Sequence, residues 1–317
     1  MEIILDPDLE ALVQQAKLAN PNPPHLADVP LEMLRAGYVM QAQMQALQGL
    51  ECEQVYDTKI IQDGCTVPAR VYRAQQAPAL QSGLIYIHGG GFTIGGLDTH
   101  DSLCRQFAIE AGLTVVSLDY RLAPEHKFPA AVDDCIAATR WILANAQSLG
   151  MQADKIGIAG DSAGGTLSAT VCNELNHSGE TMPTCQLLIY PATRTVDFET
   201  PSRRELAEGV TLDKRMIDFF NEMYFGGVAL DTADARLSPA LSDSLQGVPP
   251  AHVITAQYDP LRDEGEEYSQ LLATAGVGAS YHCYPGLMHN FVTQTAAVPA
   301  ANKAVQDCVG FLVEQLK

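Results

Sequence analysis

Apolar positions follow two different periods along the chain, and these periods alternate from about residue 80 onward. Short runs of apolar, often β-branched residues predict strands, at 84–87, 113–118, 155–159, 186–190, 252–257 and 279–284. Helical spacing of apolar residues predicts helices, at 98–111, 129–149, 162–175, 264–275 and 300–316. Near-continuous apolar strands that alternate with helices are typical of a mostly parallel sheet with helices on both faces. We therefore predict an α/β fold.

Two stretches depart from this alternation. Residues 1–50 predict two helices separated by the helix-breaking cluster at 20–24, and 52–74 predict a β-hairpin that turns at Asp63-Gly64. With the hairpin, the sheet should have about eight strands. Between 190 and 253 no strand is evident, but 213–225 predicts an amphipathic helix. We expect a main domain at 51–317 and a helical cap, formed by the N-terminal segment 1–50 and an insertion at about 193–248.

The pentapeptide Gly160-Asp161-Ser162-Ala163-Gly164 lies between a predicted strand and a predicted helix. This is the context that the G-x-S-x-G nucleophile turn requires. A tight, strained turn of this kind needs small flanking residues and exposes the serine hydroxyl beside a helix N-terminus, where negative charge is favoured. The pattern alone is weak, because a glycine-rich helix start with an N-capping serine has the same letters.

A second motif, His88-Gly89-Gly90-Gly91, also follows a predicted strand directly. Glycines allow backbone N–H groups to turn into a cleft, where they can stabilise the oxyanion of acyl transfer. We expect the amides of Gly90, Gly91 and Ala163 to form this oxyanion hole and His88 to brace the loop. A dinucleotide-binding turn would need a third glycine where the chain has Ile94.

Two further residues follow strands and complete a possible relay. Asp259 comes directly after the run 252–257, and His289 follows the last predicted strand. A serine hydroxyl needs an imidazole to accept its proton, and the imidazole needs a carboxylate to orient it. The order Ser162, Asp259, His289 is the expected one for this kind of sheet. Asp263 and Glu264 are competing candidates for the acid, although their position favours the start of a helix.

Composition narrows the range of partners. Lys and Arg total 19 while Asp and Glu total 38, so the formal net charge is −19, which disfavours nucleic acid and anionic membrane surfaces. A hydrophobic content of 47% excludes global disorder. The N-terminus lacks a basic region, and no apolar stretch reaches the roughly 18 residues of a membrane span, so we predict a cytosolic protein. The eight cysteines have no C-x-x-C spacing and predict reduced, mostly buried thiols and no metal site.

The combined motifs resemble those of the hormone-sensitive-lipase-like carboxylesterases of the α/β-hydrolase fold. The resemblance includes 88–92, 120–125, 160–165, 259–261 and His289, while 95–101 look like bacterial acetyl esterases. It implies a serine esterase for short-chain acyl esters that forms an acyl-enzyme, works without metal or cofactor and can form a homodimer. It also implies that Tyr120, Arg121 and Glu125 brace the floor of the site.

The helix at 213–225 presents candidate substrate-binding residues. Together with Phe92, we expect its large side chains to shorten the acyl pocket, namely Met216, Phe219, Phe220 and Tyr224. They could instead only pack the cap onto the main domain. Two other functions stay open: an amidase or deacetylase that uses the same three residues, and a non-catalytic small-molecule binding protein on the same fold.

Overall fold

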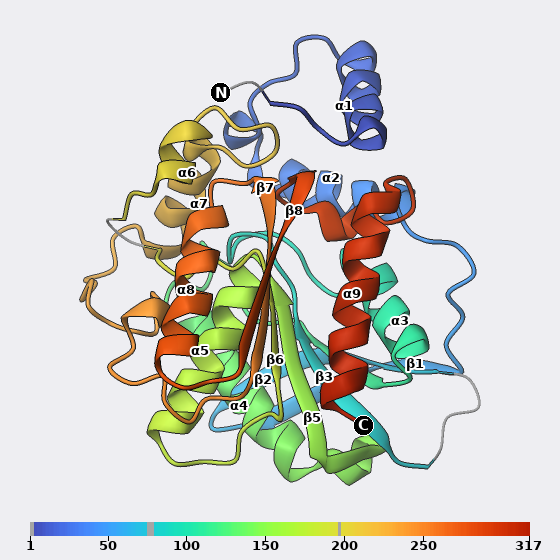
Figure 1. The fold of residues 1–317 in the computed structure, drawn as a ribbon, viewed down its shortest axis with the longest axis vertical. Helices are drawn as coiled ribbons and strands as arrows, with labels where there is room; N and C mark the ends of the chain where they lie inside the picture. Colours follow the sequence, from blue (N-terminus) through green and yellow to red (C-terminus); the bar gives the residue numbers. More distant parts are fainter. Residues whose placement is uncertain (1–2, 75–78, 196–197) are drawn as a thin grey trace.

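The computed structural model describes residues 3–74, 79–195 and 198–317. The predicted segments 1–50 and 193–248 therefore each include two residues outside the described ranges, 1–2 and 196–197. The described residues form an eight-stranded sheet in the order β1-β2-β4-β3-β5-β6-β7-β8 (Figure 1). Its strands are β1 Gln54–Gln62, β2 Cys65–Arg73, β3 Gln81–Ile87, β4 Thr114–Leu118, β5 Met151–Asp161, β6 Gln186–Ile189, β7 Ala251–Tyr258 and β8 Ala279–Met288.

The sheet is mostly parallel, as predicted. The β1–β2 hairpin and the β2–β4 pair are antiparallel, and every later pair is parallel. Neighbouring residues of a strand serve opposite faces: Leu84 and Tyr86 belong to one core cluster, and Ile85 and Ile87 to another. Both faces are therefore buried, which explains why the strands read as continuous apolar runs.

Helices cover both faces of the sheet. Helices α3 (Asp101–Glu110) and α9 (Pro299–Gln315) contribute to the first core cluster. Helices α4 (Ala130–Ala144), α5 (Ala163–His177) and α8 (Arg262–Thr274) cover the opposite face. Across the described ranges, no helix is long and apolar enough to cross a membrane.

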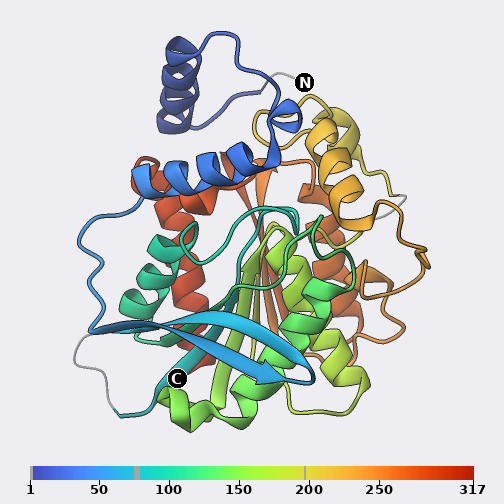
Figure 2. The ribbon, with the colours of Figure 1, turned by 180° about the vertical axis from the view of Figure 1, so that it is seen from behind.

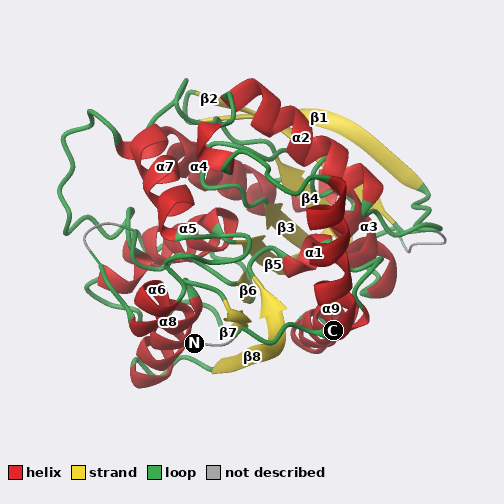
Figure 3. Cartoon of the chain, turned by 90° about the horizontal axis from the view of Figure 1, so that it is seen from above, coloured by secondary structure: helices red, strands yellow, loops and turns green. Residues whose placement is uncertain are grey.

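The remaining helices lie at the end of the molecule to which the parallel strands point. They are α1 (Pro7–Ala19), α2 (Leu31–Met44), α6 (Pro201–Glu205) and α7 (Lys214–Phe225) (Figure 2). Figure 3 looks onto this end. The N-terminal segment is attached to the sheet, because Asp6 N donates to Gly286 O at 2.9 Å and Ile4 N to the Tyr258 hydroxyl at 3.0 Å.

The structure differs from the predicted elements in particular places. The long helix predicted at 129–149 ends at Ala144, because the Asn145 side chain bonds the Trp141 carbonyl; a 3₁₀ turn, Ala146–Leu149, follows. Strand β8 continues through Gly286 to Met288, beyond the predicted end at 284. Short 3₁₀ turns also occur at Leu26–Asp28, Pro239–Leu241 and Phe291–Thr293.

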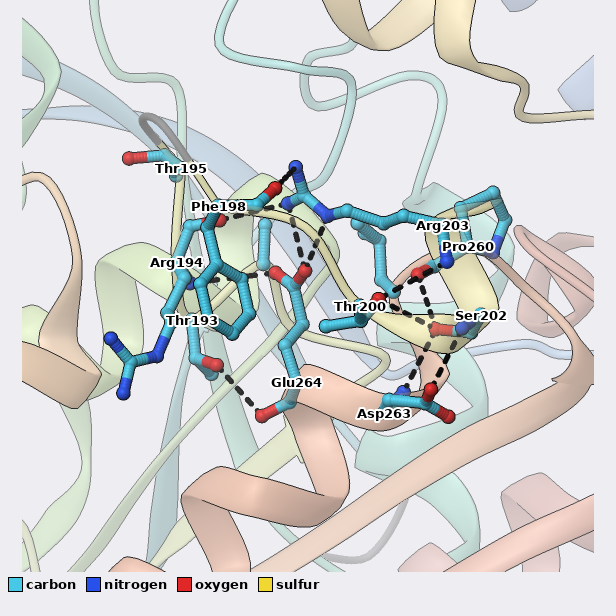
Figure 4. A network of polar contacts seen from close by, with 12 residues as sticks. Thr193, Arg194, Thr195, Phe198, Thr200, Ser202, Arg203, Pro260, Asp263 and Glu264 are labelled. Atoms are coloured by element: carbon cyan, nitrogen blue, oxygen red, sulfur yellow. Dashed lines mark hydrogen bonds and ion pairs between the residues drawn. The ribbon is translucent and has the colours of Figure 1, made fainter. Parts of the chain in front are cut away.

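A buried polar network ties α6 to the first turn of α8 (Figure 4). Arg203 of α6 forms an ion pair with Glu264 at 2.7 Å, and the Glu264 side chain is fully buried. Ser202 Oγ donates to Pro260 O at 2.8 Å, while Ser202 N donates to Asp263 Oδ2 at 2.7 Å. Burial raises the pKa of Glu264 to about 7 despite the adjacent guanidinium. The network therefore holds the segment before α7 against the turn that follows β7.

We expect Arg203→Met to lower the free energy of unfolding by about 3–5 kcal/mol, because it leaves the Glu264 carboxyl buried without its cation. Adding Glu264→Gln should restore part of that loss, since no buried charge then remains. Urea unfolding of the two variants measures both effects. Lys214→Met is the matched control, because it breaks an exposed ion pair with Asp218. A loss in Arg203→Met no larger than in this control would contradict the expectation.

Candidate active site

Ser162 occupies a sterically enforced turn between β5 and α5. Its φ is +53°, a value that non-glycine residues rarely adopt. A Cβ on Gly160 would lie 2.3 Å from Gly164 O, and a Cβ on Gly164 would lie 1.9 Å from Ile87 O. Larger residues would therefore push α5 away from β3. The small flanking residues of the motif are required by this close packing, and the turn leaves the Ser162 side chain half-buried at the end of the sheet.

Three side chains from distant parts of the chain form a continuous hydrogen-bonded line. His289 Nε2 lies 3.0 Å from Ser162 Oγ, and His289 Nδ1 lies 2.7 Å from Asp259 Oδ2. Asp259 is fully buried and His289 is 8% exposed. The backbone N–H of Leu261 donates to Asp259 Oδ1 at 2.8 Å, which fixes the carboxylate. The line brings together the residues that follow β5, β7 and β8.

The two competing carboxylates lie elsewhere. Asp263 accepts from Ser202 N, and Glu264 pairs with Arg203, so both serve the network that holds α6 (Figure 4). The imidazole of His289 contacts Asp259 instead. The structure therefore brings Asp259, rather than Asp263 or Glu264, into line with the imidazole.

The three residues predicted to supply an oxyanion hole lie around Ser162. Gly90, Gly91 and Ala163 all line the cavity beside it. Their N–H groups have no acceptor within the described part of the chain. Gly90 and Gly91 have φ values of +120° and +57°, which glycine adopts without strain. A Cβ on Gly91 would lie 2.2 Å from the ring of Phe220, so this glycine also allows α7 to approach the loop.

The carboxylate of Asp161 holds the glycine loop in register with the serine turn. Asp161 Oδ1 accepts from the Tyr86 hydroxyl at 2.7 Å and from Gly89 N at 2.9 Å, and His100 Nε2 lies 3.1 Å away. Burial opposes ionisation of this carboxyl, but His100 and Tyr86 lower the pKa of Asp161 below its usual value. Asp161, at the first unspecified position of the G-x-S-x-G pattern, thus carries a negative charge that stabilises the glycine loop.

His88 packs beneath the same loop. Its ring stacks on Tyr120 with centroids 4.4 Å apart, its Nδ1 lies 2.8 Å from Gly89 O, and the Tyr120 hydroxyl donates to His88 O at 2.9 Å. The side chain is fully buried and does not reach Ser162. The bracing contacts that we expected of His88 and Tyr120 are present.

An arginine that sequence patterns did not single out joins α2 to this loop. Arg35 Nε donates to Thr93 O at 3.0 Å, its Nη2 donates to Ala123 O at 2.9 Å, and both terminal nitrogens contact the Glu125 carboxylate at 2.8 Å. The hydrogen bonds from Arg35 to the Glu125 carboxylate lower the pKa of Glu125 to about 2. Glu125 therefore anchors the N-terminal segment. Arg121 makes a separate pair with buried Asp134, at 2.8 Å.

The cavity above Ser162 has a volume of about 480 Å³. Of the five residues predicted to bind substrate, Phe92, Met216 and Phe220 line it. Phe219 and Tyr224 do not. Tyr224 is 2% exposed and stacks behind Phe92 with ring centroids 4.2 Å apart, because it faces the main domain instead of the cavity. Phe219 packs beside Phe220 in the cluster between α2 and α7.

This arrangement has the parts that acyl transfer needs. A hydroxyl contacts an imidazole, the imidazole is oriented by a buried carboxylate, and residues whose backbone N–H groups have no acceptor in the described chain line the same cavity. The cavity is large enough for a small ester. Within the described ranges, no group of three His, Cys, Asp or Glu residues could hold a metal ion.

Because His88 is buried, its contribution to the free energy of unfolding depends on pH. Burial, and then the neighbouring His100, lower the pKa of His88 from 6.5 to about 4. Between these values the unfolded chain binds a proton that the folded chain excludes. Stability therefore falls with falling pH, by about 3 kcal/mol in total from this group. Glu264, with its raised pKa, contributes in the opposite sense over an overlapping range.

We therefore compare the free energy of unfolding of the wild type with that of His88→Asn. Both proteins contain Glu264, so its contribution cancels in the difference. We expect any advantage of the wild type to shrink as the pH falls from about 6.5 to about 4. Urea unfolding at several pH values measures the difference. A difference that is independent of pH would show that His88 titrates normally in the folded chain.

A model of the alpha/beta hydrolase fold family matches residues 84–293. The chain is similar to esterase LipI of Mycobacterium tuberculosis, with 44% identity over 70% of this chain and 69% of the relative. It is also similar to ethyl acetate hydrolase of Pseudomonas putida, with 37% identity over 80% of each chain.

Among solved structures, a hyperthermophilic esterase from Pyrobaculum calidifontis is similar along nearly the whole length. It is 38% identical with a TM-score of 0.91, and the match covers 98% of this chain and 99% of the other. The range that the family model matches, 84–293, begins within β3 and ends after His289. It therefore includes Ser162, Asp259 and His289. The chain belongs to the alpha/beta hydrolase fold family.

Proposed function

We propose that this protein is a serine carboxylesterase that hydrolyses short-chain acyl esters through an acyl-enzyme intermediate. The observation that carries the proposal is the line from Ser162 Oγ through His289 to buried Asp259, next to amides with free N–H groups. Relatives named esterase and ethyl acetate hydrolase support the reaction class.

The proposed reaction begins when Ser162 Oγ attacks the ester carbonyl and His289 Nε2 accepts its proton. The amides of Gly90, Gly91 and Ala163 stabilise the oxyanion, each contributing about 3–4 kcal/mol. His289 then protonates the leaving alcohol, and the acyl group stays on Ser162. Water, deprotonated by His289, releases the acid. Asp259 remains ionised and holds the imidazole in the required tautomer.

We further propose that residues 1–50 and the insertion at about 193–248 act as a cap that selects substrates. Residues of α2 and α7 line the cavity together with the serine turn, among them Leu34, Tyr38, Met216 and Phe220. Phe220 lies against Gly91, one of the amides proposed for the oxyanion. Its bulk limits the space beside the reacting carbonyl and favours acyl chains from acetyl to hexanoyl.

The alternatives use the same cavity. A non-catalytic binding protein would not need the hydroxyl, imidazole and carboxylate in one line, so the intact line favours catalysis. Amide hydrolysis would use the same residues, and a panel of matched esters and anilides distinguishes the two reactions. We propose a cytosolic location. We also propose a homodimer through β8, the last strand of the sheet, which light scattering can test.

We expect Ser162→Ala to lower kcat for p-nitrophenyl acetate by about 10⁶-fold, because the hydroxyl, the imidazole and the carboxylate act as a unit. Ser178→Ala, at the exposed C-terminal end of the same helix, is the control and should hydrolyse like the wild type. A fluorophosphonate probe should label Ser162 alone. Near-full activity of Ser162→Ala, or an adduct on another residue, would refute the assignment.

We expect Phe220→Ala to move the optimum of p-nitrophenyl acyl esters toward longer chains, because it removes bulk beside Gly91. Phe219→Ala is the matched control: the same substitution, one residue away, outside the cavity lining. An acyl series from acetate to palmitate measures both profiles. The proposal fails for Phe220 if both variants keep the wild-type optimum, and rates that rise from butyrate to palmitate in the wild type contradict a short-chain preference.

A further inference from the structure

The cavity beside Ser162 is lined by apolar and by polar residues. The apolar ones include Phe92, Met216 and Phe220. Among the polar ones we use the name polar wall for Tyr38 of α2 and for Asn290 and Gln294, which follow His289 in the chain. The mechanism uses none of these three polar groups.

Gln294 is a buried carboxamide with no protein partner. The residue is 4% exposed and lines the cavity. Its side chain makes no hydrogen bond to any residue that the structure describes, and its Oε1 is buried and unpaired. Leaving such a group unpaired costs about 1–3 kcal/mol, which is why buried polar side chains nearly always have a partner. The Oε1 atom has almost no accessible surface, so the carboxamide can meet a ligand in the cavity only through its N–H₂ group, or through the oxygen after turning over.

Backbone hydrogen bonds fix the main chain at Gln294. Gln294 N donates to Phe291 O at 2.9 Å, and Gln294 O accepts from Val298 N at 3.0 Å. The carboxamide of Asn290 has a side-chain partner, because its Oδ1 accepts from the Tyr38 hydroxyl of α2 at 3.3 Å. The carboxamide of Gln294 therefore differs from that of Asn290 in being free to bond a ligand.

In the proposed reaction this polar wall is assigned to the leaving alcohol. His289 must protonate the alcohol oxygen, so the alcohol portion lies toward His289, while the carbonyl oxygen points to the amide cradle. Asn290 directly follows His289, and Gln294 comes one 3₁₀ turn later. A polar group on the alcohol would therefore meet the Gln294 carboxamide, which can offer either its oxygen or its N–H₂ group by turning over.

We propose, on the basis of the esterase function above, that the preferred substrates are short-chain acyl esters of hydroxylated alcohols, such as monoesters of a polyol. A free hydroxyl of the alcohol portion binds Gln294, with Asn290 and Tyr38 completing the polar wall. An alkyl ester of the same size leaves the amide unpaired and reacts more slowly. Sites that hydrogen-bond a substrate hydroxyl reject analogues that lack it for this reason.

The test compares 3-hydroxypropyl butyrate with n-butyl butyrate, which share the acyl group and differ by a hydroxyl in place of a methyl. We expect the wild type to favour the hydroxylated ester by about tenfold in kcat/KM. Gln294→Leu, which keeps the side-chain size, should bring this ratio close to one, mainly through slower hydrolysis of the hydroxylated ester. Gln270→Leu, at an exposed glutamine of α8, is the control and should keep the wild-type ratio.

Two results overturn the proposal: a wild-type ratio near one, or a ratio that Gln294→Leu leaves unchanged, including an equal loss for both esters. The wild-type ratio needs no variant to fold, so it decides independently. Failure of the esterase assignment itself looks different, because the wild type would then hydrolyse neither ester or Ser162→Ala would hydrolyse both.

Discussion

The close contact between the serine turn and the end of β3 is the constraint on which the site depends. Gly164 lies against the backbone of Ile87, and Gly160 lies against Gly164, so no side chain fits at either position. The chain reverses from β5 into α5 with Ser162 at φ +53°. Strain of this kind persists only where the surrounding structure enforces it. Here it places the hydroxyl beside the N-terminus of α5.

The buried charge of Asp161 transmits this constraint to the glycine loop. Its carboxylate precedes Ser162 in the chain and accepts the N–H of Gly89, so the serine turn and the loop share one hydrogen bond. Tyr86 donates to the same oxygen. Full burial makes such a bond strong and its loss costly. The serine turn and the glycine loop are therefore tied directly to each other, although the sequence separates them widely.

The sequence predicts those parts of the site that follow from general chemistry. The strand–helix alternation predicted the sheet, and the chain order of Ser162, Asp259 and His289 predicted residues that the structure brings together. Those features depend on local pattern and on the common edge where parallel strands end. The choice among Asp259, Asp263 and Glu264 depended on position after a strand, and the contacts of each carboxylate now distinguish them.

The remaining features depend on long-range contacts that no local pattern encodes. Tyr224 and Phe220 lie on one amphipathic helix, yet only Phe220 faces the cavity, because the orientation of α7 is set by its packing on Phe92. Arg35 looks like an ordinary helix residue until the fold places Glu125 beside it, about ninety positions away. Gln294 belongs to no sequence motif, because what distinguishes it is a side chain without a hydrogen-bond partner among the described residues.

The segments proposed to form a cap are hydrogen-bonded to the loops that surround Ser162 and Asp259. Arg35 links α2 to the carbonyl of Thr93 on the glycine loop, and Ser202 of α6 links the insertion to Pro260, the residue after Asp259. A shift of either helix would thus strain the glycine loop or the turn after Asp259, as well as change the cavity. If the proposed cap selects substrates, these hydrogen bonds connect that selection to the geometry around Ser162.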